Sequence, residues 1–231
     1  MTNEEERCWA TRNAHNKERG LTRVISHRGH LAGPDPVLAN NPKHIEEVLW
    51  EHEFDAEVDV WKVGDQWWLG HVEPINLISV DWLYEQDESD GLWIHCKNRE
   101  ALMALSTTGL RFFWHENDQF ALTSQGDIWN HVHNKQEIKT SRSVISRFDV
   151  EQKLKSLDAF CGGICTDYPI ALRERLYVEH CNSNSRERDE DTRDVRCPQA
   201  PDSSSREDRH RTLCRIARSI WPVCLCDKKV Q

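Results

Sequence analysis

Residues 22–109 alternate between short apolar runs and segments with helical spacing, and this alternation limits the possible folds more than any other feature. Residues 22–29 form an apolar run that ends in polar residues, as a short strand does. Residues 41–52 place Ile45, Val48 and Leu49 at helical spacing. Residues 54–61 and 90–98 are expected as further strands, with a helix over 99–109. Such alternation is typical of a mostly parallel sheet, open or closed into a barrel.

The following residues continue the strand pattern with less helical signal. Residues 110–116 are expected as a strand, and 119–129 and 141–148 are strand-like. A helix is predicted over 149–160, and residues 162–169 resemble a last strand. These elements complete a folded zone that we assign to residues 22–175.

Two segments flank this zone. Residues 1–21 form a polar arm that is typical of neither a secretory signal nor a membrane anchor. Residues 176–231 are rich in Ser, Arg and Asp, so we expect a low-complexity, disordered tail. A short helix is possible near 211–221, where Leu213, Ile216 and Ile220 share one face and could dock a partner.

Composition excludes some classes of function. The net charge of −9 disfavours general nucleic-acid binding, which needs clustered cations. No apolar run approaches the length of a transmembrane helix. Nine cysteines without a secretory signal favour reduced thiols, and therefore a cytoplasmic protein.

The strand expected over 54–61 carries two carboxylates on one face. Ala56, Val58 and Val60 alternate with Glu57 and Asp59, so the two acids point the same way. A pair of this kind suits an oxygen-ligated divalent cation such as Mg²⁺ or Ca²⁺. The alternative is an exposed strand face with solvated acids.

The strand expected over 90–98 repeats this arrangement, with His95 and Lys97 on a common face. His95 could complete a metal site, and Lys97 could pair with a phosphate oxygen. A structural histidine and a solvated lysine are the alternatives. If all four groups were buried together, a metal ion or ion pairing would be needed to offset the cost.

Further candidates follow the first strand and the hairpin after the second. Gly29 permits a sharp turn behind His27, and Arg28 offers a bidentate fork for phosphate. His71 follows the hairpin, twelve residues after Asp59. Two histidines beside a carboxylate-held metal would supply a general base and a general acid for cleaving a phosphodiester.

Four motifs together resemble the glycerophosphodiester phosphodiesterase family: SHRG at 26–29, EVD at 57–59, the hairpin histidine, and GICTDYP at 163–169. The resemblance extends from about residue 22 to residue 172. It implies a (β/α)8 TIM-type barrel, here compact with a trimmed second half, because such barrels need at least about 200 residues. It also implies a divalent metal ion. The roles implied are catalysis for His27 and His71, metal binding for Glu57 and Asp59, and phosphate contact for Arg28 and Lys97.

The sequence departs from the family in two places. His95 stands where the family has a glutamate ligand, and imidazole makes a transition metal possible. Residues 32–42 replace the family's usual segment after HRG and lack its glutamate.

Two further segments carry acidic or imidazole side chains for which the sequence allows more than one role. Asp167 could contact the site or stabilise the turn before Pro169. His115, with Glu116 and Asp118, is expected at a strand end, on the side where a substrate group could dock.

The resulting hypothesis is a metal-dependent phosphodiester hydrolase that acts on a small phosphodiester. One alternative is a degenerate barrel that binds a phosphorylated ligand without turnover. The other is an interaction protein that acts through its tail.

Overall fold

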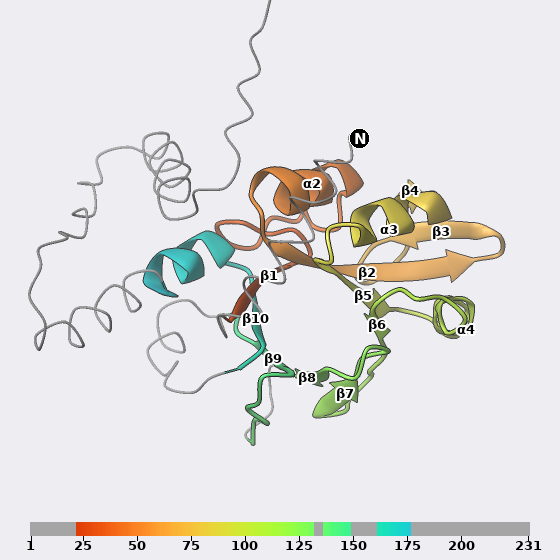
Figure 1. Ribbon diagram of the computed structural model, residues 1–231. Coiled ribbons are helices and arrows are strands. Elements are labelled where there is room, and N and C mark those ends of the chain that lie inside the picture. The colour runs from red at the N-terminus through yellow and green to blue at the C-terminus, as the bar shows by residue number, and fades with distance from the viewer. Residues whose placement is uncertain (1–21, 132–135, 149–160, 177–231) are drawn as a thin grey trace, which may run out of the picture. The chain divides into compact units, whose positions relative to one another are not determined.

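The described residues form a mixed sheet that curls into a half-barrel, with short helices beside it (Figure 1). The computed structural model describes residues 22–131, 136–148 and 161–176. The strands are β1 (Arg23–His27), β2 (Asp55–Val63), β3 (Gln66–Leu69), β4 (Asn76–Ile78), β5 (Leu92–Cys96), β6 (Phe112–Phe113), β7 (Phe120–Leu122), β8 (Ile128–Asn130), β9 (Ser143–Ser146) and β10 (Gly163–Thr166).

Strand β2 is the branch point of this sheet. The order is β4-β3-β2-β1-β10-β9-β8-β7, and β5 also joins β2 and continues to β6. The pairs of β2 with β1 and β5 are parallel, whereas its last residues pair antiparallel with β3. Because β1, β10, β9 and β8 are also mutually parallel, the carboxyl ends of these strands lie at one rim. Ligands commonly bind at such a rim in folds with parallel strands.

The helices begin at side chains that cap their first turns. Helix α2 (Pro42–Glu46) runs directly into a π-helical turn, η1 (Glu47–Glu51), and residues 169–176 are also helical. Helices α3 (Val80–Asp87) and α4 (Arg99–Leu105) complete the set in the described ranges. Asn41, Ser79 and Asn98 each accept a hydrogen bond from a backbone N–H of the helix that follows.

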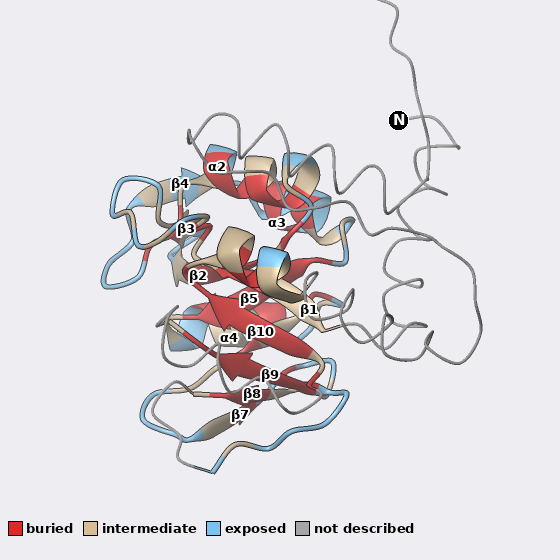
Figure 2. Ribbon diagram, turned by 90° about the vertical axis from the view of Figure 1, so that its left-hand side faces the viewer, coloured by how far each residue is buried: buried red, intermediate tan, exposed pale blue. Residues whose placement is uncertain are grey.

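The buried apolar residues of the described ranges form three clusters, and Figure 2 shows β5, β9 and β10 among the most buried elements. The smallest cluster contains Ile145, Cys161, Ile164 and Leu172. Ala56, Val58 and Val60 pack, together with helical residues such as Ile45 and Leu83, in an outer core. A separate inner core contains Ile25, Trp93, Phe113, Ala121, Trp129, Val144 and Cys165.

The inner core sits directly below a polar layer. On six strands, a residue that packs in the inner core is followed two positions later by a polar residue, which therefore points to the same side. These pairs are Ile25 and His27, Trp93 and His95, Phe113 and His115, Trp129 and His131, Val144 and Ser146, and Cys165 and Asp167. The sheet thus concentrates ionisable groups above an aromatic floor.

The predicted (β/α)8 TIM-type barrel is wrong. The sheet is mixed, with antiparallel pairs between β2 and β3, β3 and β4, and β7 and β8. Between β6 and β7 and between β7 and β8, the connections 114–119 and 123–127 are too short to contain a crossover helix. The result is a curled half-barrel in which strands predominate.

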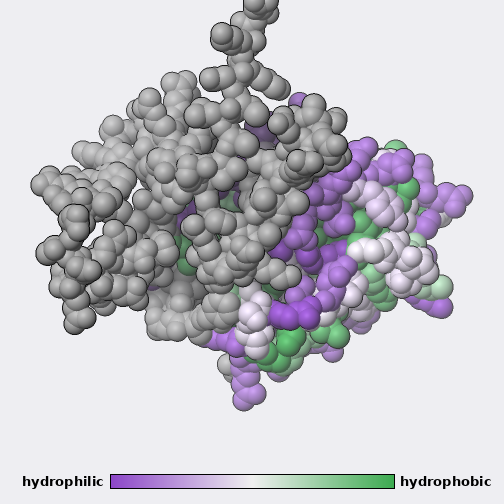
Figure 3. Space-filling view, in the orientation of Figure 1, coloured by the Kyte–Doolittle hydropathy of each residue, from purple (hydrophilic) through white to green (hydrophobic). Residues whose placement is uncertain are grey.

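Several expectations lie outside the described residues. They are the polar arm over 1–21, the helix over 149–160, and the tail beyond residue 176 with its possible helix near 211–221. Within the described ranges, no helix is long and apolar enough to cross a membrane. The described surface visible in Figure 3 is largely hydrophilic, with smaller hydrophobic patches between.

Candidate functional site

A cavity of about 390 Å³ opens at the rim formed by the carboxyl ends of the strands. Six of the seven site residues predicted from the sequence line it: His27, Arg28, Glu57, His71, His95 and Lys97. The seventh, Asp59, is fully buried and contacts Arg28, His95 and Lys97. The structure therefore brings all seven residues together.

The turn after β1 aims Arg28 at the carboxylates. His30 N donates to His27 O, and the central residues Arg28 and Gly29 have φ values of 55° and 84°. A positive φ is rare for a residue with a side chain and occurs often at functional sites. In this conformation, Arg28 Nε lies 3.0 Å from Asp59 Oδ2.

Strand register places His95 against the carboxylate pair. Asp59 lies opposite His95 in the β2–β5 pair, and His95 Nδ1 is 3.0 Å from Asp59 Oδ1 and 3.7 Å from Glu57 Oε1. Lys97 Nζ is 3.3 Å from Asp59 Oδ1. The Asn40 side-chain amide donates to Asp59 Oδ2 at 3.0 Å. Asp59 is therefore surrounded by donors, whereas Glu57 has fewer.

Because of this difference, the pKa values of the two acids shift in opposite directions. Burial and the adjacent charge of Asp59 raise the pKa of Glu57 to about 8. Burial opposes ionisation of Asp59 as well, but the hydrogen bond with His95 and the charges of His95, Lys97 and Arg28 lower its pKa below the ordinary value. Ionising both acids is costly without a further cation near Glu57.

Among the residues that the structure describes, two groups of buried or partly buried side chains have donor atoms close enough to hold a metal ion. One consists of Glu57, Asp59 and His95, whose donor atoms all lie within 4.8 Å of one another. The chemistry of this set fits a divalent ion, because two carboxylates supply charge and the uncompensated Glu57 would gain a counterion. Its imidazole extends the range to transition metals. The other group consists of His27, His30 and Asp167.

His27 is held on two sides. Its Nδ1 lies 2.7 Å from Asp167 Oδ1, and its ring stacks on Phe148 with centroids 4.3 Å apart. Its Nε2 lies 4.0 Å from Glu57 Oε2, at the cavity. Burial lowers the pKa of His27, although the hydrogen bond with Asp167 acts in the opposite direction.

His71 lies on a short loop after β3, exposed at the mouth of the cavity. The preceding residue is fixed to β2 in two ways: Gly70 N donates to Asp59 O, and Trp61 Nε1 donates to Gly70 O. Partial burial lowers the pKa of His71 to about 4, although Asp59 raises it, and the cations Arg28 and Lys97 lower it further. A bound anion between these cations would favour the protonated imidazole.

His115 and His131 continue the cavity lining beyond His95 as an imidazole wall. The His115 ring stacks on His95 with centroids 4.5 Å apart and meets His131 edge-on at 4.7 Å. Burial lowers the pKa of His115 to about 4, so this ring is neutral at physiological pH. The sequence predicted His115 near a docking side but missed His131. The signal for both is an aromatic residue two positions earlier.

Asp167 and His30 complete the surroundings of His27. Of the two roles considered for Asp167, the structure shows contact with a site residue. His30 was not singled out, because its burial depends on a strand more than 130 residues away in the chain.

Comparisons with known proteins give no further identification: no family model, no curated protein and no solved structure matches this chain.

Proposed function

We propose that this protein is a metal-dependent phosphodiester hydrolase acting on a small phosphodiester. The observation that carries the proposal is the convergence, at one cavity, of a buried carboxylate pair, two cations and two histidines. Each group has a separate task in phosphodiester cleavage: charge neutralisation, phosphate binding and proton transfer.

Arg28 and Lys97 are suited to bind the phosphate. Both lie at the cavity, and both contact Asp59, so they enter the site as partly compensated cations. An incoming phosphate oxygen can share their N–H donors with this carboxylate. The guanidinium would supply two parallel hydrogen bonds, and the ammonium a point charge.

Glu57, Asp59 and His95 would hold the divalent ion. When bound, the ion would neutralise the phosphate and lower the pKa of an attacking hydroxyl group. Mg²⁺ or Ca²⁺ is expected from the carboxylates, and a transition metal from His95. Glu57 would stay ionised in that state, because the ion removes the penalty that raises its pKa.

His27 and His71 would move the protons. They approach the cavity from different elements, His27 at the end of β1 and His71 on the loop after β3. One accepts a proton from the attacking hydroxyl, and the other donates one to the leaving alcohol.

A second candidate is binding of a phosphorylated ligand without turnover. It is favoured by the contacts of Asp59, which is already paired with Arg28 and Lys97 and lies within hydrogen-bond distance of His95 without an ion. In that case Arg28 and Lys97 alone would bind the ligand, and chelation of metals would leave binding unchanged.

An activity screen on the full chain separates these candidates. Bis(p-nitrophenyl) phosphate and glycerophosphocholine are offered with Mg²⁺, Ca²⁺, Mn²⁺ or Zn²⁺, with and without chelator. We expect hydrolysis that chelator abolishes and Glu57→Gln lowers. The matched control is Glu85→Gln, an exposed acid on α3. Absence of hydrolysis with every metal, or full activity in Glu57→Gln, would contradict the proposed function.

A further inference from the structure

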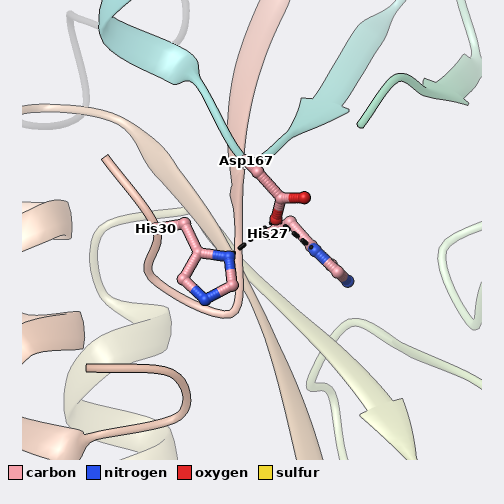
Figure 4. Close-up of side chains that lie close together, drawn as sticks. All are labelled: His27, His30 and Asp167. Atoms are coloured by element: carbon pink, nitrogen blue, oxygen red, sulfur yellow. Dashed lines mark hydrogen bonds and ion pairs between the residues drawn. The ribbon is translucent and has the colours of Figure 1, made fainter. Parts of the chain in front are cut away.

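A second buried polar unit lies behind His27, away from the carboxylate pair. Asp167 stands between two imidazoles, as Figure 4 shows, and accepts hydrogen bonds from both. The distances to Asp167 Oδ1 are 2.7 Å from His27 Nδ1 and 2.6 Å from His30 Nδ1. His30 and Asp167 are only 5% and 7% exposed, so solvent does not compete for these bonds.

The backbone fixes this unit at three points. Strands β1 and β10 are parallel with Ser26 opposite Thr166, so the next residues of the two strands are His27 and Asp167. The Ser26 hydroxyl donates to His30 O at 2.7 Å. Gly33 N donates to Asp167 O at 2.8 Å. The three side chains therefore meet on a corner whose geometry is set by the sheet.

The distances identify where the protons are. An ionised carboxylate only accepts hydrogen bonds, so an imidazole nitrogen at 2.6–2.7 Å must carry a proton and donate it. These lengths are those of charge-assisted hydrogen bonds. The hydrogen bonds lower the pKa of Asp167 despite its burial, which agrees with an ionised acceptor. In neutral His27, the lone pair is therefore on Nε2.

The same contacts direct Nε2 into the cavity. Stacking on Phe148 fixes the plane of the His27 ring, and the hydrogen bond at Nδ1 fixes which edge faces inward. Nε2 then lies 4.0 Å from Glu57 Oε2, on the side where the divalent ion and phosphate would bind. A proton acceptor is thus present at the cavity and held in one orientation.

We infer that Asp167, itself held by His30, is a positioning residue that fixes His27 as the Nδ1–H tautomer and so makes His27 the proton acceptor of the site. The role in turnover rests on the proposed function, whereas the tautomer does not. In the reaction, Nε2 takes the proton of the attacking hydroxyl while its oxygen bonds to phosphorus. The bond from phosphorus to the alcohol breaks, and the alcohol takes a proton from His71. Solvent then restores both histidines.

The tautomer is measured directly by long-range ¹H–¹⁵N NMR of the imidazoles in the metal-free full chain. The His27 signals are assigned with His27→Gln. We expect a protonated Nδ1 and an unprotonated Nε2 in the wild type at a pH where the ring is neutral. In Asp167→Asn, the protonated position should shift toward Nε2, and Asp167→Glu should restore Nδ1–H. Asp65→Asn, at an exposed turn, is the control that should change nothing.

Kinetics provide a second readout. Asp167→Asn should lower kcat by roughly 10²-fold or more with little change in KM, because the base is misdirected while phosphate binding persists. Asp167→Glu should recover part of kcat. A purely structural role would instead lower the melting temperature of both variants alike and leave the tautomer unchanged.

Two results would overturn the inference. One is a wild-type His27 that carries its proton on Nε2. The other is a Zn²⁺-induced shift of both Nδ1 signals in Glu57→Gln, because the three residues would then be a metal site. Failure of the proposed function is distinguishable: the wild type would hydrolyse no phosphodiester, yet the NMR result for the tautomer would still hold.

Discussion

Glu57 and Asp59 are two residues apart on one strand face, and the protein shifts their pKa values in opposite directions. Asp59 has two cations, Arg28 and Lys97, and the His95 imidazole within about 3.3 Å, whereas Glu57 is buried beside a negative charge. In this pair, the charge of Asp59 is therefore balanced by neighbouring cations, whereas a charge on Glu57 would not be balanced.

This asymmetry predicts a pH dependence of stability in chelator. A carboxyl group whose pKa is raised from 4.5 to about 8 keeps its proton in the folded state after the unfolded state has lost it. The free energy of unfolding should therefore fall as pH rises through that window. The measurement is denaturant unfolding of wild type and Glu57→Gln, and their difference should decrease by a few kcal/mol, since one pKa unit is about 1.4 kcal/mol. If the free energies of unfolding of the two proteins changed with pH in parallel, the raised pKa of Glu57 would be refuted.

Replacing the histidines should separate proton transfer from folding. His27→Ala and His71→Ala should each lower the rate by roughly 10²-fold or more, with the fold intact as judged by a cooperative unfolding transition. His52→Ala, at the end of η1, is a matched control away from the cavity lining. Near-normal turnover in both variants would remove these two residues from the mechanism.

A change at His95 should alter the choice of metal. His95→Glu replaces an imidazole donor by a carboxylate, so preference should move toward Mg²⁺ or Ca²⁺ and away from Zn²⁺. Competition calorimetry with these three ions measures the change. The same order of affinities in both proteins would show that His95 is not a ligand.

Gly29 is required by both conformation and space. Its φ is +84°, and a Cβ there would lie 2.7 Å from Ile45 Cδ1. Gly64 has φ +59° with nothing within 4 Å of a Cβ, so Gly64→Ala is the matched control for backbone strain. Gly64→Ala should cost about 1–2 kcal/mol, and Gly29→Ala clearly more, because Ile45 must move. If chemical denaturation showed that both variants lose the same free energy of unfolding, the contact with Ile45 would be unimportant.

The strands that carry the site were predictable from the sequence because their pattern is strong. β1, β2, β5 and β10 each contain four or more residues with clear apolar content, and the i, i+2 rule then places Glu57 with Asp59 and His95 with Lys97. These positions need no knowledge of the tertiary structure.

The closure of the fold was not predictable in the same way. β8 has only three residues and gives no recognisable period, so His131, which follows it, was missed, although His115 after β6 was predicted. Helix α3 was missed because its buried residues Trp82, Leu83 and Gln86 form only a narrow apolar face. The resemblance to a known family then favoured a helix-rich barrel where the chain forms hairpins.

The most direct test of the central claim, that the carboxylate pair binds a divalent ion required for phosphodiester cleavage, is a joint titration of binding and activity. Metal-free full chain is titrated with the most active ion, and calorimetric binding and hydrolysis are measured in the same preparation. Both curves should share one midpoint in the wild type, and both should be lost in Glu57→Gln and retained in Glu85→Gln. Hydrolysis that persists in chelator, or metal binding that is unchanged in Glu57→Gln, would contradict the claim.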